Sequence, residues 1–396
     1  MTPPSKRGLA LLLLLVLVGT GGSLAYWRHR DVAGVVNEAA APIAAASAGY
    51  MASNSGTAVG SSRARVAAPA PSLAIEAEAA TSGEMDIPPE GFEFCGVRRV
   101  PANELRRWKA DPVWGKTQLQ QIEDQRERIS AAGLARISAR LAAGNDRQQV
   151  AARLLMQDRD GAALLAERST DAQAYQMALT ACAWPRRDTP NCARLNPGRW
   201  AQLDPLDARP WMRMMQAAQS RKDQAAVDSA LAQAAARPGL SRGSFLLEAL
   251  AVAAADAVPD AAELGQALAV VIGIDAAMPG FDMGAPGRAC RGEALNDATR
   301  LAHCRTVARQ ALASATDLGD AQMAQKLADR TGVPPNQQAY DAVTLKAAEE
   351  RFHARALDLD VDCESMRRLK QLSAERAASG DLAMAMALLP PRAPAR

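Results

Sequence analysis

The sequence is poor in aromatic residues. Phe, Trp and Tyr make up 4% of its 396 residues, although 48% are hydrophobic, so the apolar content is mostly Ala, Leu, Met and Val. These residues favour helices, whereas sheets are enriched in aromatic and β-branched side chains. We therefore expect an all-α protein and predict no strands.

The chain also lacks a large excess of either charge. It has 46 basic and 43 acidic side chains, a net charge of +3. Nucleic-acid-binding proteins usually carry a strong basic excess. Nucleic acid is accordingly excluded as an expected partner.

Motifs for catalysis and for cofactors are missing as well. There is no Gly-x-Ser-x-Gly elbow, phosphate loop or dinucleotide fingerprint. Only three histidines occur, His29, His303 and His353, and none has a second ligand at the close spacing of a zinc site. We predict no cofactor, no metal and no catalytic residue, so the protein is not expected to be an enzyme.

One long apolar segment is present near the N-terminus. Gly8 to Trp27 carry no charge and are flanked by Lys6 and Arg7 on one side and by Arg28 to Arg30 on the other. A helix of this length spans roughly the 30 Å of a bilayer core. We expect residues 1–30 to form a single-pass anchor in the inner membrane, with the body in the periplasm. Cleavage after Ala25, where small residues suit signal peptidase, would instead give a periplasmic or secreted protein.

Two regions of different composition follow the anchor. Residues 31–90 are rich in Ala, Ser and Pro without apolar periodicity, which predicts a disordered linker. Residues 91–390 have helical periodicity interrupted by Pro and Gly, as at Pro238–Gly239 and Pro334–Pro335. The predicted helices are Lys116–Ala143, with a break near Gly133, then Asp146–Met156, Gly161–Arg168, Ala172–Ala183, Ala208–Ser220, Gln224–Arg237, Arg242–Ala255, Ala261–Ala277, Asp297–Ala315, Ala321–Arg330, Asn336–Ala356 and Cys363–Ala378.

The six cysteines are even in number and all follow the apolar segment. An oxidising compartment lets disulfides persist, although six cysteines allow fifteen pairings. A loop with two prolines favours Cys182–Cys192. A helix beginning at Asn296–Asp297 would let Cys290 reach Cys304. Cys95 and Cys363 remain, either joined across the body or as two free thiols.

Two segments resemble the tetratricopeptide repeat, a helix pair of about 34 residues. Asp204 to Pro238 contains Trp211 on a first helix, Val227, Leu231 and Ala234 on a second, and a closing proline. Thr170 to Tyr175 repeats the entry pattern, with Tyr175 matching Trp211. The resemblance implies stacked antiparallel helix pairs in an α-solenoid.

Tetratricopeptide-like solenoids expose the first helix of each pair along a concave groove. The resemblance implies that a protein or peptide partner binds residues exposed there, namely Arg209, Met212, Arg213, Gln216 and Gln219, with Gln173 and Gln176 on the preceding unit. The preferred hypothesis is therefore a membrane-tethered periplasmic scaffold.

Two alternatives remain open from the sequence. One is an enzyme acting on cell-envelope glycan with Glu364 as general acid, although no Gly- and aromatic-rich core follows Glu364-Ser365. The other is a structural spacer without a specific ligand.

Overall fold

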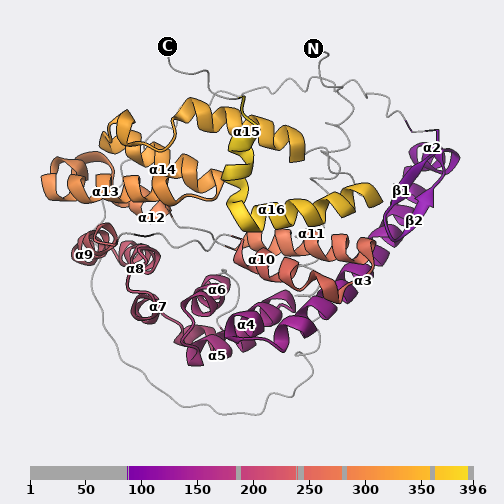
Figure 1. The fold of residues 1–396 in the computed structure, drawn as a ribbon, viewed down its shortest axis with the longest axis horizontal. Coiled ribbons are helices and arrows are strands. Elements are labelled where there is room, and N and C mark those ends of the chain that lie inside the picture. The colour runs from indigo at the N-terminus through magenta and orange to yellow at the C-terminus, as the bar shows by residue number, and fades with distance from the viewer. Residues whose placement is uncertain are drawn as a thin grey trace, which may run out of the picture. The chain divides into compact units, whose positions relative to one another are not determined.

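The computed structural model describes residues 87, 89–183, 189–237, 239, 245–278, 283–356 and 362–390 (Figure 1). The predicted anchor and nearly all of the predicted linker lie outside these residues. Among the described helices, none combines the length and the hydropathy that a bilayer span requires.

The described part of the chain is all-α. It contains 15 α-helices and one small hairpin. The helices are α2 (Ala102–Ala110), α3 (Pro112–Ala142), α4 (Asp146–Leu155), α5 (Arg159–Arg168), α6 (Ala172–Cys182), α7 (Pro197–Leu203), α8 (Arg209–Ser220), α9 (Gln224–Ala235), α10 (Leu246–Ala253), α11 (Ala261–Ala277), α12 (Gly284–Ala289), α13 (Ala298–Ser314), α14 (Leu318–Thr331), α15 (Ala342–Ala356) and α16 (Cys363–Ala387).

Acidic or amide caps fix most helix starts. The side chain of Asn145 accepts a hydrogen bond from the backbone of α4, and Asp171, Asp223 and Asp260 do the same for α6, α9 and α11. Such caps satisfy amides that have no partner within the helix. Most predicted helices therefore start within two residues of where the structure has them. The exceptions are α3, α10, α14 and α15, which begin at Pro112, Leu246, Leu318 and Ala342 rather than at Lys116, Arg242, Ala321 and Asn336.

The expectation of no strands is wrong at one place. β1 (Phe92–Phe94) pairs antiparallel with β2 (Arg98–Val100). Gly96 in the connecting turn has φ +74°, a conformation that glycine adopts without strain. Strands of three residues are too short to show periodicity, and Phe94 is instead held by packing beside Trp108.

The predicted break near Gly133 is also wrong, because α3 is continuous. A Cβ at Gly133 would lie 2.9 Å from the Cβ of Ala267 and 3.0 Å from the carbonyl oxygen of Glu263. Glycine is used here for close packing of α3 against α11 rather than to end the helix.

The helices form a closed circuit of contacts. From α3 each helix packs on the next as far as α9, which packs on α13, and α13 to α16 continue the series. α11 contacts both α16 and α3, so it connects the end of this series to α3, where the series begins (Figure 1). α10 lies beside α11 and α16 rather than between α9 and α13.

Three disulfides connect elements of the body. Cys95–Cys363 joins the hairpin to the start of α16, with 4.6 Å between the Cα atoms, Cys182–Cys192 closes the loop after α6, and Cys290–Cys304 joins α12 to α13. The second and third of these are the pairings that the sequence favoured. For Cys95 and Cys363 the sequence left a bridge and two free thiols open, and the structure has the bridge. In the chain-entropy model, a crosslink over 268 residues raises the free energy of the unfolded chain by roughly 5 to 6 kcal/mol.

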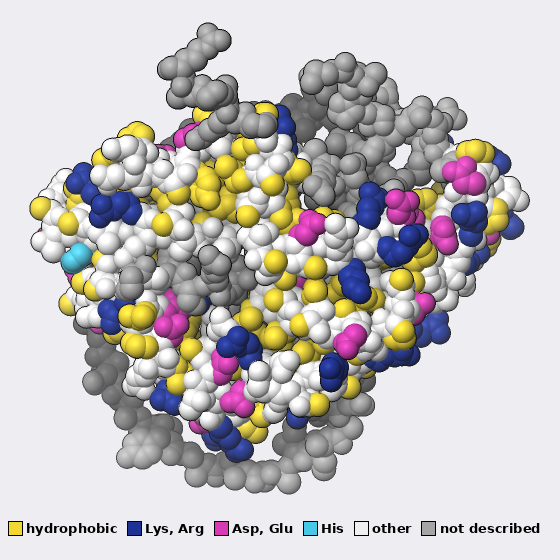
Figure 2. All heavy atoms as spheres, viewed as in Figure 1, with side chains coloured by type: hydrophobic (Ala, Val, Ile, Leu, Met, Phe, Trp, Pro, Cys, Tyr) yellow, Lys and Arg dark blue, Asp and Glu magenta, His cyan; other side chains and the backbone are white. Residues whose placement is uncertain are grey.

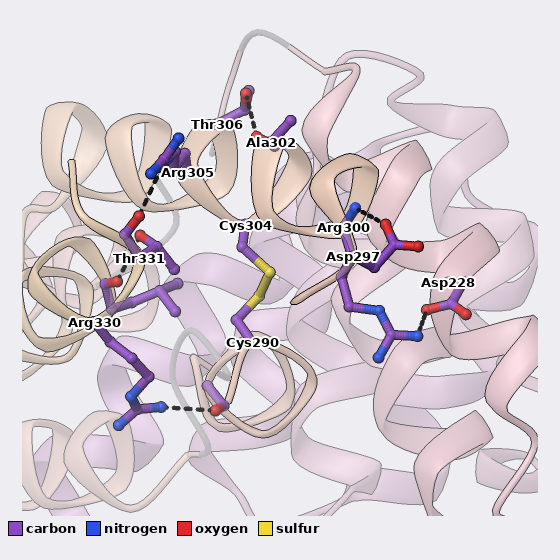
Figure 3. The surroundings of a disulfide bond; sticks show 12 residues. Asp228, Cys290, Asp297, Arg300, Ala302, Cys304, Arg305, Thr306, Arg330 and Thr331 are labelled. Atoms are coloured by element: carbon purple, nitrogen blue, oxygen red, sulfur yellow. Dashed lines mark hydrogen bonds and ion pairs between the residues drawn. A yellow bond between two sulfur atoms is a disulfide. The ribbon is translucent and has the colours of Figure 1, made fainter. Parts of the chain in front are cut away.

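The surroundings of Cys290–Cys304 show how the segments around α12 are held (Figure 3). Arg300 of α13 forms an ion pair with Asp228 of α9. Arg330 of α14 donates to the backbone oxygen of Gly287, at 2.9 Å. Cys290 and Cys304 are both fully buried in the core formed by α8, α9 and α12 to α14.

Candidate functional site

The predicted partner groove lies on α6 and α8, and part of it is interior. Arg209, Met212 and Gln176 are 8%, 1% and 9% exposed. The expectation that these three residues face solvent is therefore wrong. Met212 belongs to a large hydrophobic core with Met215 and Leu231, to which α12 and α13 also contribute residues. α12 packs directly on α8.

Arg209 is buried in a polar cluster that links α6, α7 and α8. Its guanidinium pairs with the fully buried carboxylate of Asp207 at 2.8 Å and donates to the side-chain oxygen of Gln176 at 2.9 Å. The same group stacks on Trp200 at 5.1 Å. A buried charge with these partners orients neighbouring helices and cannot reach an external partner.

The far end of the predicted groove is covered by the chain itself. Gln219 donates to the backbone oxygen of Ala285 at 2.8 Å and accepts from Arg288 at 2.9 Å. Both partners belong to α12, which is bound through Cys290 to α13. α12 therefore covers the part of α8 on which the sequence predicted a bound partner.

The remaining predicted residues are half-buried at the surface. Gln173 lies on α6, and Arg213 and Gln216 lie on α8. Between the two helices stands α7, which packs on both. The surface of α6 and α8 that a partner could contact therefore includes fewer of the predicted residues than the sequence indicated.

The two aromatic residues that carry the repeat resemblance have different environments. Tyr175 is buried, and its hydroxyl accepts from the backbone nitrogen of Asn196 at 2.9 Å. Trp211 is half-buried under the guanidinium of Arg237, 4.4 Å from the ring centroid. Tyr175 and Trp211 occupy matching positions in the two repeat-like segments, but the two side chains are not packed in the same way.

A cluster of acidic residues, which the sequence did not reveal, lies where α14 meets α16. Asp381 accepts from the backbone nitrogen of Leu318 at 2.9 Å, and Asp317 caps α14 through the nitrogen of Asp320 at 3.0 Å. Burial, together with the nearby carboxylates of Asp317 and Asp381, raises the pKa of Asp320 to about 8, although Arg209 opposes the shift. Burial and Asp317 raise the pKa of Asp381 to about 6.

A second acidic pair lies between α10, α11 and α16. Glu248 is fully buried 3.5 Å from Arg376, and its backbone nitrogen donates to Asp275 at 2.9 Å. Burial raises the pKa of Asp275 to about 7 and also raises that of Glu248, with Arg376 opposing both shifts. Perturbed carboxyls of this kind occur at functional sites and in structural networks alike.

In the sequence, these acids are marked only by their positions near the ends of helices. Ordinary helix-capping residues occupy the same positions, so this signal does not identify a buried cluster. Their burial arises from contacts between helices far apart in the chain. Within the described residues, no group of His, Cys, Asp and Glu has the arrangement of a metal site. Glu364 is exposed in the first turn of α16.

Comparison of the chain with protein-family models, with curated proteins and with solved structures found no match.

Proposed function

We propose that this protein is a helical scaffold of the cell envelope, tethered by residues 1–30 and holding its body outside the cytoplasm, where it binds a protein or peptide partner. The observation that carries the proposal is the pairing of all six cysteines in three disulfides. Structural disulfides are rare in reducing compartments. The apolar segment Gly8 to Trp27 supplies the matching export signal.

The proposed architecture is a tetratricopeptide-like array of helix pairs. Its support is the packing of α8 on α9 and of α13 on α14, with α9 and α13 in contact between the pairs. α10 and α11 interrupt this order along the chain and pack instead against α3 and α16. The array is therefore proposed for the pairs α8/α9 and α13/α14 rather than for a continuous solenoid.

The partner surface in this proposal is the exposed part of α6 and α8. Gln173, Arg213 and Gln216 offer amide and guanidinium groups with partial solvent access, which suits recognition of peptide carbonyl and carboxylate groups. Arg209, Met212 and Gln176 support this surface from below, and Gln219 is engaged by α12.

Mass mapping of protein extracted from its native host under thiol-blocking conditions tests the compartment. The expected result is three disulfide-linked peptide pairs and no blocked cysteine. Six blocked thiols would contradict placement outside the cytoplasm.

Crosslinking in cells tests the partner surface. Arg213→Glu with Gln216→Ala should abolish a crosslinked species that the unchanged chain forms. The matched control, Arg367→Glu with Gln371→Ala, alters exposed residues on α16 and should leave that species intact. Equal loss in both variants, or no reproducible species at all, would argue for a spacer without a ligand.

A further inference from the structure

One end of the body carries exposed cations around an exposed apolar side chain. This hairpin-end surface consists of Arg106, Arg107 and Lys109 of α2 with Val113 and Lys116 at the start of α3. All five residues are exposed. The helices are held together beneath them, where a Cβ at Gly115 would lie 2.9 Å from the backbone oxygen of Trp108.

The acids near this surface are engaged by other arginines or by the backbone. Glu104 forms an ion pair with Arg98 at 2.7 Å, and Glu93 lies 3.7 Å from Arg99. Figure 2 shows acidic and basic side chains together around α2. Asp111 accepts from the backbone nitrogen of Trp114 at 3.1 Å as the cap of α3.

The cations of the surface itself have no such compensation. Among the described residues, Arg106, Lys109 and Lys116 take part in no ion pair, and the guanidinium of Arg107 stacks on Trp114 at 4.2 Å. The hairpin-end surface therefore has a net positive charge that Asp111 offsets only in part.

Val113 gives the surface an apolar point. It is 79% exposed, and the half-buried ring of Trp114 follows it directly. An apolar side chain among Lys and Arg is the combination with which peripheral proteins hold an anionic bilayer, since the apolar group enters the interface while the cations meet headgroups.

The surface is also close in sequence to the predicted linker. Residues 31–90 lead directly into the hairpin and α2. The disordered linker that the composition of these residues predicts would have a mean span of about 40 Å. A tethered surface experiences a high effective concentration of the membrane, so even weak contacts are populated.

We propose that the hairpin-end surface docks on the anionic phospholipid headgroups of the membrane that carries the tether. The inference rests on the proposed tethering, and it gives the body a defined orientation. The cations would contact phosphate groups, and Val113 would enter the interface between them.

Lysine footprinting of the full chain in lipid nanodiscs tests the docking. Acylation of Lys109 and Lys116 should slow several-fold in discs containing phosphatidylglycerol relative to phosphatidylcholine discs, and high salt should remove the difference. Lys326 and Lys346, exposed on α14 and α15, are internal controls whose labelling should not depend on the lipid. Inorganic phosphate added to phosphatidylcholine discs should protect neither pair.

Two matched variants separate charge from apolar contact. Arg106→Glu should restore rapid labelling of Lys109 and Lys116 in phosphatidylglycerol discs, whereas Lys326→Glu should not. Val113→Asn should weaken the protection, while Val343→Asn, at a residue with the same 79% exposure, should have no effect.

Equal labelling of Lys109 and Lys116 in both kinds of disc would overturn the docking, as would full protection by free phosphate alone. A chain that does not copurify with discs would contradict the tethering instead. In that case flotation of the free chain with phosphatidylglycerol vesicles decides the docking, which is rejected if Arg106→Glu floats as well as the unchanged chain.

Discussion

At the scale of single residues, the type of a side chain on α8 does not indicate whether that side chain is buried or exposed. Met212 and Arg209 looked equally suited to a groove, yet both are enclosed. Arginine tolerates this position because Asp207 and Gln176 satisfy its guanidinium. A polar side chain in an amphipathic helix is therefore weak evidence of a binding face unless its partners are known.

Met212→Ala should lower the free energy of unfolding by about 2–5 kcal/mol, because it leaves a cavity in the core formed by α8, α9 and α12 to α14. Met323→Ala, at a position that is 40% exposed, should lower it by less than about 0.5 kcal/mol. Urea titration followed by circular dichroism measures both. Similar values for the two variants would place Met212 at the surface after all.

At the scale of elements, the sequence predicted the helices better than their arrangement. Caps such as Asp171 and Asp223 act within a few residues, so the helix starts were readable. The short helices α2, α7 and α12 were missed because they are shorter than the window in which periodicity shows. The partial covering of α8 by α12 depends on Cys290 reaching Cys304, and the acidic junction depends on α14 meeting α16, so neither could be read locally.

The contact between α11 and α16 depends on a glycine. A Cβ at Gly265 would lie 2.6 Å from the Cβ of Met366 and 3.0 Å from its backbone oxygen. Gly265→Ala should therefore destabilise the fold by about 1–3 kcal/mol, since the two backbones must move apart.

Gly287→Ala provides the control for this variant. A Cβ added at Gly287 would have no neighbouring atom within 4 Å, so the substitution should be neutral or mildly stabilising. Thermal unfolding of the two variants gives the comparison. A Gly265→Ala protein as stable as the unchanged chain would show that the two helices are not in close contact.

At the scale of the whole molecule, several carboxyls in the body favour the protonated state. The pKa values of Asp320, Asp275 and Asp381 are raised to about 8, 7 and 6. The folded protein therefore binds more protons than the unfolded chain between about pH 4 and pH 8. This contribution to stability is complete below about pH 4 and is lost as the pH rises through the raised values.

The unfolding temperature should consequently fall as the pH is raised from 5 to 8. Asp320→Asn should flatten this dependence, because the amide cannot ionise, whereas Asp256→Asn, at an exposed residue, should not. Asp160 and Asp171 have lowered pKa values and lose their contribution only at lower pH. Calorimetry across this range measures the slope, and a rising unfolding temperature would contradict the assignment.

The nested order of the sulfur bridges has a consequence for biogenesis. Cys95 is the first cysteine along the chain and bonds to the last one, while the other two bridges join neighbours in sequence. Under the export proposed above, an oxidase that linked cysteines in the order in which they leave the cytoplasm would join Cys95 to Cys182. The native pattern therefore requires Cys95 to stay reduced until synthesis is nearly complete, or a disulfide isomerase to reshuffle the early product, so maturation of this protein should depend on isomerase more than its small number of bridges suggests.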